Sequence, residues 1–245
     1  MRRAALMGTI GTAGITVAAG AGALPARAQD TAGVPVLEAT ADGNAFGNLG
    51  FTPATADVVI GQTIHWRNTN RIAPHTVTEP HGLFDLTGNA VGGTASSPAG
   101  FGPGSTVELT AFAGTTTYIC RVHPGRMSGV FRAPVVTALG PGYKAPRIPA
   151  RTKAGKARRA ELKKNFQRRL TLTWATVEPT EGQAYDVQVK RGAGPWKPLL
   201  TRTVDTTITI ASGKRGTTSK VRARMRQEKD ESRGTGWSPE VMVRP

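Results

Sequence analysis

The sequence has little of several residue types on which common function classes depend. Cys120 is the only cysteine among 245 residues, so an internal disulfide framework is excluded. There are only four histidines. The sequence also lacks a nucleophile elbow, a His-Glu-x-x-His helix and a glycine-rich phosphate loop. These absences argue against α/β-hydrolases, zinc proteases and P-loop nucleotidases, respectively.

Long apolar runs are scarce as well. The one such stretch, Ala4 to Leu24, follows a basic head and ends close to Ala26-Arg27-Ala28, which has the small-x-small form of a cleavage site. We therefore predict a signal peptide over 1–28 and a mature chain that is secreted, at the cell surface or in the periplasm. A membrane anchor is the competing interpretation, but the stretch is rich in Gly and Ala and only weakly hydrophobic.

Acidic residues are outnumbered two to one, and the formal net charge is +16. The excess of positive charge is unevenly distributed. Residues 29–136 carry five basic and seven acidic residues, residues 137–169 carry eleven basic residues and one acidic residue, and residues 170–245 carry thirteen basic and eight acidic residues. Nucleic acid is not the expected partner, because the chain looks exported and no aromatic residues interleave with the cations of 137–169. An anionic cell-wall polymer or a membrane surface fits better, and a solvated spacer is the plain alternative.

The remaining pattern predicts an all-β protein of two domains. Residues 55–67 give two β-branched runs broken at Gly61, residues 106–112 alternate apolar with polar, and a third strand is expected over 115–120. Within residues 29–136 no window has a convincing 3.6-residue period, whereas Lys153 to Phe166 has good helix formers with few apolar residues and is expected to be a short basic helix or disordered. We predict one domain over 29–136, a basic linker over 137–169 and a second domain over 170–245.

A compact run of soft ligands gives the strongest functional signal. Cys120, His123 and Met127 lie within eight residues, and a lone thiol in an oxidising compartment needs a use such as metal ligation. With His75 they make up the His2Cys set and weak axial Met that suit copper. His65 and His81 do not share this pattern and are not expected to be ligands.

The chain resembles the cupredoxins, the plastocyanin-like and azurin-like blue copper proteins, over about Val34 to Val136. The resemblance is carried by Phe51-Thr52-Pro53, by Val59 to Asn68, by Pro74-His75-Thr76-Val77, and by Tyr118-x-Cys120-x-x-His123-Pro124 ahead of Met127. It implies a Greek-key β-sandwich with one type 1 copper, held by His75, Cys120, His123 and Met127. Many members have Asn where this chain has Thr76, and three residues between His123 and Met127 match only some of them.

The resemblance implies a one-electron carrier and not an enzyme, since four protein ligands leave no position for substrate. Four histidines are also too few for a multicopper enzyme. Copper delivery or tolerance is one alternative, and a cell-surface interaction protein without a redox role is another. Arginines near the ligand segments predict a redox partner with an acidic docking surface: Arg67, Arg71, Arg121 and Arg126.

The segment 170–245 resembles a fibronectin type III domain. Its β-rich runs include Trp174 in an early strand, Tyr185 in a central one and Gly234 to Pro239 before the last. Such modules usually bind other molecules or separate neighbouring domains, so the resemblance implies an interaction or spacer role. Ser219 stands where the family usually has a tyrosine. We expect Trp174 and Tyr185 to be packing residues rather than parts of a ligand cleft.

Overall fold

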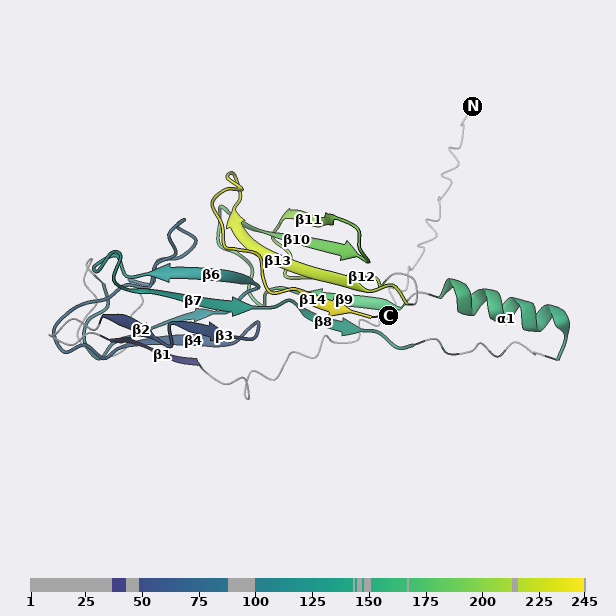
Figure 1. The fold of residues 1–245 in the computed structure, drawn as a ribbon, viewed down its shortest axis with the longest axis horizontal. Helices are drawn as coiled ribbons and strands as arrows, with labels where there is room; N and C mark the ends of the chain where they lie inside the picture. Colours follow the sequence, from purple (N-terminus) through teal and green to yellow (C-terminus); the bar gives the residue numbers. More distant parts are fainter. Residues whose placement is uncertain are drawn as a thin grey trace, which may run out of the picture.

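The computed structural model describes residues 37–42, 49–87, 100–142, 144, 147, 151–166, 168–212 and 216–244. These residues form fourteen strands and one helix, so the all-β prediction is confirmed. The predicted signal peptide lies outside the described residues. Among the residues described, no helix is both long enough and apolar enough to cross a membrane. The molecule is elongated, with two β-sandwiches along its length and the helix at one end (Figure 1).

The first sandwich contains two sheets with strand orders β2-β1-β4-β5 and β3-β7-β6. Its β1–β4 and β3–β7 pairs are parallel and the others antiparallel. The predicted strands appear close to their expected bounds, and Gly61 makes the break with a φ of 83°. The strands are β1 (Leu37–Asp42), β2 (Gly50–Thr52), β3 (Thr55–Asp57), β4 (Thr63–Asn68), β5 (Thr106–Thr110), β6 (Gly114–Ile119) and β7 (Ser128–Ala133).

Alternation along β4 and β6 puts large side chains between these two sheets. Trp66 of β4 and Tyr118 of β6 are both buried, and their rings meet edge to face with centroids 5.2 Å apart. Gly129 on β7 leaves room for the Tyr118 ring, because a Cβ there would lie 2.4 Å from it. Packing of these buried aromatic rings fixes the separation of the two sheets and the position of the end of β6, which Cys120 follows.

The second sandwich has sheets ordered β11-β10-β13-β14 and β12-β9-β8. Trp174 and Tyr185 are buried in its core, as predicted. Trp237 is half-buried and, with Trp196, brackets the Arg222 guanidinium at 4.6 and 4.2 Å. The strands are β8 (Val136–Leu139), β9 (Arg169–Thr173), β10 (Gln183–Arg191), β11 (Trp196–Thr203), β12 (Thr207–Ala211), β13 (Ser219–Gln227) and β14 (Val241–Val243).

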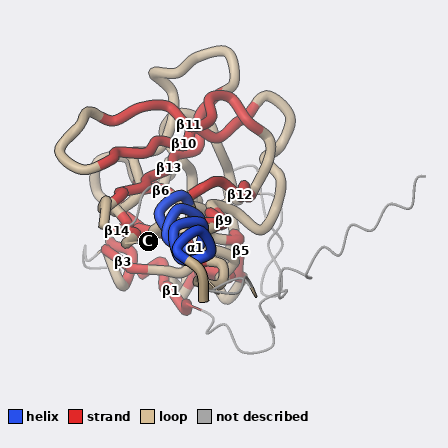
Figure 2. The backbone as a smooth tube through the Cα atoms, turned by 90° about the vertical axis from the view of Figure 1, so that its right-hand side faces the viewer, coloured by secondary structure: helices blue, strands red, loops and turns tan. Residues whose placement is uncertain are grey.

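The basic segment between the predicted domains begins and ends in strands of the second sandwich. β8 and β9 pair antiparallel, and the Gly140 N–H donates to the Arg169 carbonyl over 2.7 Å. Between them runs an arm, residues 140–168, whose helix α1 (Lys153–Asn165) extends away from the sandwiches (Figure 1) and is seen end-on in Figure 2. Thr152 caps this helix, its side chain accepting from the Gly155 N–H.

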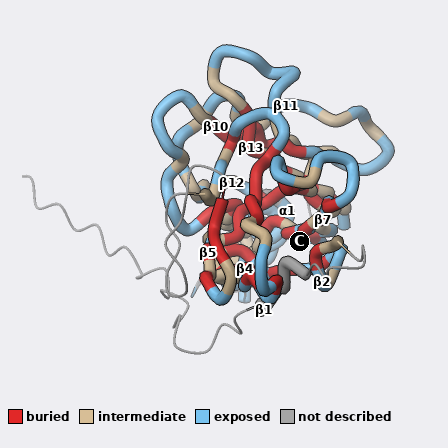
Figure 3. The backbone as a smooth tube through the Cα atoms, turned by 90° about the vertical axis from the view of Figure 1, so that its left-hand side faces the viewer, coloured by how far each residue is buried: buried red, intermediate tan, exposed pale blue. Residues whose placement is uncertain are grey.

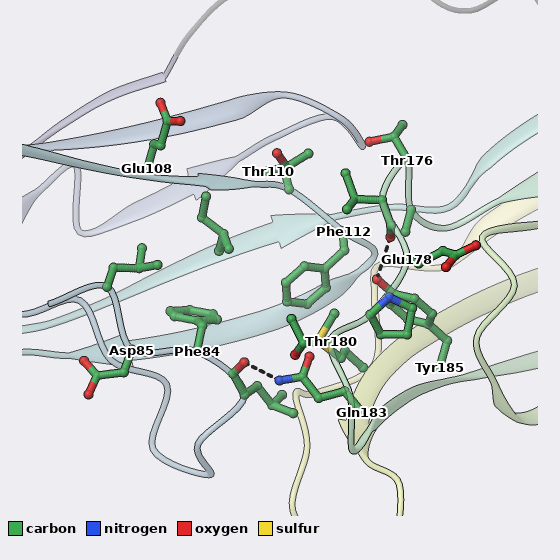
Figure 4. A pocket seen from close by; sticks show the side chains of 18 residues that line it. Phe84, Asp85, Glu108, Thr110, Phe112, Thr176, Glu178, Thr180, Gln183 and Tyr185 are labelled. Atoms are coloured by element: carbon green, nitrogen blue, oxygen red, sulfur yellow. Dashed lines mark hydrogen bonds between the residues drawn. The ribbon is translucent and has the colours of Figure 1, made fainter. Parts of the chain in front are cut away.

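The two sandwiches meet directly, and their buried residues form one hydrophobic cluster. Figure 3 shows buried backbone in both. Thr115 and Gly236 exchange two backbone hydrogen bonds, of 3.0 and 2.9 Å, and the Ala113 N–H donates to the Trp174 carbonyl. Beside this junction lies a cleft of about 400 Å³ with Phe112 and Tyr185 in its wall, where the Gln183 amide donates to the Leu83 carbonyl (Figure 4).

Candidate metal centre

His75 lies on the loop after β4, and backbone bonds fix that loop. The His75 N–H donates to the Phe101 carbonyl over 3.1 Å, and the Phe101 N–H donates back over 2.8 Å. The buried Asn68 side chain donates to the carbonyls of Ala73 and Phe101, at 3.0 and 2.9 Å. These bonds hold the loop against residues 100–101, and His75 is fully buried.

Cys120 and His123 lie on one tight turn between β6 and β7. The His123 N–H donates to the Cys120 carbonyl over 3.2 Å, and the Arg126 N–H donates to the His123 carbonyl over the same distance. The Cys120 N–H donates to the Met127 carbonyl, which closes the turn at the start of β7. Gly125 supplies the positive φ, 74°, that the turn requires. The spacing of the motif therefore sets both side chains on the same side of this turn.

Three side chains bring their donor atoms to one point. Cys120 Sγ lies 3.7 Å from His75 Nδ1 and 3.5 Å from His123 Nδ1, and the three ligand atoms lie within 4.8 Å of one another. Bonds of about 2.3 Å to sulfur and about 2.0 Å to nitrogen, at roughly 109–120°, place two ligands of one metal ion about 3.5–3.8 Å apart. The sulfur-to-nitrogen distances therefore fit a single shared metal ion.

The sulfur of Cys120 also receives a backbone hydrogen bond. The Thr76 N–H points at Cys120 Sγ over 3.3 Å, and the Thr76 hydroxyl accepts from the Arg121 N–H over 2.8 Å. Thr78 Oγ1 lies 3.1 Å from Thr76 Oγ1 and 3.0 Å from a carboxylate oxygen of Asp85. Thr76 thus ties the His75 loop to the Cys120 turn, although this chain lacks the Asn found there in many cupredoxins.

Asn70 lies beside the Nε2 edge of the His75 ring. Its Oδ1 accepts from the N–H groups of Ile72 and Ala73, which fixes the orientation of the amide. Its Nδ2 lies 3.4 Å from His75 Nε2. The His75 ring therefore lies with Nδ1 toward the Cys120 thiol and with Nε2 beside the Asn70 amide group.

The His123 imidazole is the more accessible of the two. Partial burial lowers its pKa, and the positive charge of Arg126 lowers it further. Both influences favour the neutral ring, which is the form that binds a metal ion. Its ring centroid lies 5.0 Å from that of His75.

The structure brings together three of the four residues predicted as ligands. Met127 is buried at the start of β7 and shares a backbone hydrogen bond with Cys120, and its role as the axial ligand stays a prediction. His65 lies elsewhere, 3.2 Å from Glu108 across the β4–β5 pair, and His81 lies in an exposed loop. Neither joins the cluster formed by the described residues.

Three supporting residues were not predicted from the sequence. The stretch 88–104 is rich in Gly, Ala and Ser and gives no sign of core residues, yet Phe101 is fully buried and pairs with His75 through backbone hydrogen bonds. Gly100 has a φ of 136°, and a Cβ there would lie 2.2 Å from the His75 carbonyl oxygen. Asn70 likewise gave no signal, because its contact with His75 depends on the course of the loop.

The donor set fits copper. A buried thiolate and two imidazoles form a soft sulfur and nitrogen site, and a thioether belongs to the same class of ligand. Hard cations such as Mg²⁺ and Ca²⁺ prefer oxygen ligands, and the described cluster contributes no oxygen ligand.

No family model matches the sequence. Among solved structures, the chain is similar to a purple cupredoxin from Nitrosopumilus maritimus, with 21% identity over 40% of this chain and 98% of that one and a TM-score of 0.29. It is also similar to the Cu(I) form of a methionine-to-alanine mutant of amicyanin, with 24% identity over 42% and 88% and a TM-score of 0.30.

A third similar structure is the copper-containing nitrite reductase from Thermus scotoductus, with 20% identity and a TM-score of 0.29. The match covers 40% of this chain and only 22% of the reductase, so this chain spans under a quarter of that protein's length.

Proposed function

We propose that this protein is an exported type 1 copper protein that carries single electrons. The observation that supports this most directly is the convergence of His75 Nδ1, Cys120 Sγ and His123 Nδ1 on one point in a largely buried site. We propose Met127 as the fourth, weak axial ligand. A copper ion bound there supplies one-electron chemistry, because it alternates between Cu(II) and Cu(I).

The surrounding residues suit electron transfer in two ways. Backbone bonds at Phe101 and Met127 and the Thr76 bridge hold the ligands in place, so little rearrangement is needed when charge changes. Four protein ligands leave no open position for a substrate, which favours a carrier over an enzyme. The Thr76 N–H bond to Cys120 Sγ stabilises negative charge on the thiolate.

A redox partner would meet the protein at the end that carries His123. Arg67, Arg71 and Arg126 are exposed there, beside Ile72, whose side chain is 78% exposed. Arg67 and Arg71 flank a hollow of about 630 Å³ next to the His75 loop. Exposed cations near the metal site suit a partner with an acidic docking surface, and such docking weakens with salt.

The proposal also places the protein outside the cytoplasm, after removal of residues 1–28, and gives it a fibronectin type III-like module from residue 170. The buried free thiol agrees with this, because it is shielded from oxidative pairing. We propose interaction rather than catalysis for the second sandwich.

The copper proposal is tested by adding Cu(II) and recording visible and electron paramagnetic resonance spectra. We expect an intense thiolate-to-copper band with narrow hyperfine splitting, lost in Cys120→Ser and in His123→Gln. His81→Gln is the matched control, because His81 is exposed and outside the cluster, and it should leave both spectra unchanged. Equal copper binding by Cys120→Ser and the parent protein would remove the basis of the proposal.

A second measurement separates electron transfer from copper delivery. The loaded protein is mixed with a redox dye and, separately, with a copper chelator. A carrier should be reduced and reoxidised over many cycles while it keeps its metal. Rapid loss of copper to the chelator, with slow redox cycling, would favour delivery or tolerance instead.

A further inference from the structure

The basic arm does not separate the two sandwiches. Its two ends lie side by side at the β8–β9 pair, where Leu139 is opposite Leu170 and the Arg168 guanidinium donates to the Gly140 carbonyl over 2.9 Å. The chain therefore leaves the second sandwich at residue 140 and returns to the same place at residue 168. The sandwiches already touch through other residues, so a spacing role does not explain the arm.

The helix in this arm carries its positive charges mainly on one face. At about 100° per residue, five cations fall within an arc of about 140° along the helix, which is about 20 Å long. Four of the five are exposed and Arg159 is half-buried. Arg158 lies on the opposite side. The five, named here the cationic face, are Lys153, Lys156, Arg159, Lys163 and Lys164.

Little in the described part of the chain neutralises the lysines of this face. The helix contains one acidic residue, Glu161, and none in its first turn. Within the described part of the chain, its four lysines form no ion pair, whereas Arg121, Arg132 and Lys220 on the sandwiches pair with Asp85, Asp57 and Glu240. Five like charges on about three turns repel one another, so an external anion would be stabilised there.

The apolar content of the arm argues against a membrane as the partner. Leu162 and Phe166, 42% and 38% exposed, are the large apolar side chains that the described arm exposes, and the other helix positions are mostly alanine or charged. Helices that lie in a lipid interface need a broad apolar face. The arm also lacks the row of aromatic residues on which single-stranded nucleic acid stacks.

We propose that the cationic face binds a linear anionic polymer bearing phosphate or carboxylate groups. The face is straight, narrow and regularly charged, which matches an extended chain of anions better than one small anion. The helix projects from the body at one end of the molecule, so its cationic face is open to a polymer (Figure 1).

The test measures binding of the full chain to linear polyphosphate and to polyglutamate over a range of salt. The arm variant is Lys153→Gln with Lys156→Gln, Lys163→Gln and Lys164→Gln, because Gln keeps helix propensity. The matched control removes four exposed cations from the second sandwich instead: Arg191→Gln, Lys197→Gln, Lys229→Gln and Arg244→Gln. Circular dichroism verifies that both variants keep their structure.

We expect the parent affinity to fall about 100-fold between about 50 and about 200 mM salt, as for five phosphate contacts. The arm variant should bind at least about tenfold more weakly at about 50 mM, with a salt slope smaller by about 3, while the control changes that slope by less than about 1. The polymer that binds more tightly, polyphosphate or polyglutamate, identifies the anionic group.

Several outcomes would overturn the proposal. Equal losses in the two variants would mean that net charge alone attracts the polymer. If the protein bound neither polymer, linear anionic polymers would be excluded as its partner. Arm-dependent binding to vesicles containing phosphatidylserine, but to neither polymer, would assign the arm to membranes. Tighter binding to single-stranded DNA than to polyphosphate of equal charge would assign it to nucleic acid.

Discussion

The hydroxyl of Thr76 accepts a 2.8 Å hydrogen bond from the backbone N–H of Arg121, so the residue after one histidine is tied to the residue after the cysteine. The two residues are 45 positions apart. Thr76 is fully buried, so its hydroxyl has no water to replace this contact. This single side chain connects the two segments from which the metal centre is assembled.

Replacement of Thr76 by Val keeps the shape of the side chain and removes this acceptor. We expect the free energy of unfolding to fall by about 1–3 kcal/mol, because the Arg121 N–H loses its partner. The copper band should also broaden as the turn loosens. Denaturant unfolding of the metal-free protein measures the first effect and the visible spectrum the second.

Thr117→Val is the control for that experiment. Thr117 is exposed on β6, so the same change should alter stability by less than about 0.5 kcal/mol. An unaltered stability in Thr76→Val would show that the two segments are held together without its hydroxyl.

Gly100→Ala should disturb His75 directly. The added Cβ would lie 2.2 Å from the His75 carbonyl oxygen, and the φ of 136° is one that Ala rarely adopts. The strain in φ alone costs about 1–3 kcal/mol, and relief of the clash must move the histidine loop. We expect copper affinity to fall at least tenfold, as measured by competition with a chelator.

Gly142→Ala serves as the comparison, since an added Cβ meets no atom within 4 Å there and its φ lies outside the positive range. Its copper affinity should equal that of the parent. If Gly100→Ala also retained the parent affinity, the 100–101 segment would have no part in positioning His75.

Met127→Leu tests the axial ligand. Leu has a similar volume, so the buried site should tolerate it at a cost below about 1.5 kcal/mol. Loss of a weak sulfur donor stabilises Cu(II) less, so the reduction potential should rise, on the order of 60 mV for a tenfold change in the equilibrium constant of one-electron transfer. A redox titration measures the shift.

The same substitution at Met225, buried in the second sandwich, leaves the proposed ligands untouched and should leave the potential unchanged. An unchanged potential in Met127→Leu as well would mean that Met127 is a core residue and not a ligand.

The two sandwiches should unfold in one transition. They share one hydrophobic cluster, and the paired bonds between Thr115 and Gly236 join their backbones. The proposed ligands meet only in the folded state, so copper at a free concentration of about 100 times the dissociation constant should add up to about 2.7 kcal/mol to the stability of the whole. Scanning calorimetry should show a single unfolding peak, and its midpoint temperature should rise when metal is added. Two peaks, of which only one shifts with metal, would mean that the two sandwiches unfold independently.

The sequence predicted those parts of the site that depend on local spacing. Cys120 and His123 lie on one turn, so their short separation along the chain fixes their proximity. Strands such as β4 and β6 can be recognised in the sequence because buried and more exposed positions alternate along them. His75 was predicted because the set needed one more histidine and because the resemblance implies it, but its approach to Cys120 is a long-range contact that local spacing does not show.

The parts that were not predicted depend on backbone meeting backbone far along the chain. Phe101 pairs with His75 through two backbone hydrogen bonds, from a segment whose composition resembles an open loop. The Pro- and Gly-rich residues after Leu139 look like a linker, and no local pattern shows that the chain returns beside itself at Arg169. The register of β8 with β9 is set by the fold as a whole.

The turn that carries Cys120 and His123 and the helix α1 lie at opposite ends of the long axis (Figure 1). A molecule immobilised through its helix would therefore point its copper outward, into the surrounding solution. In that orientation the metal centre would stay accessible to diffusing electron donors and acceptors while the helix remains bound. The elongated shape would then favour electron exchange between soluble partners and protein molecules that are immobilised at a surface.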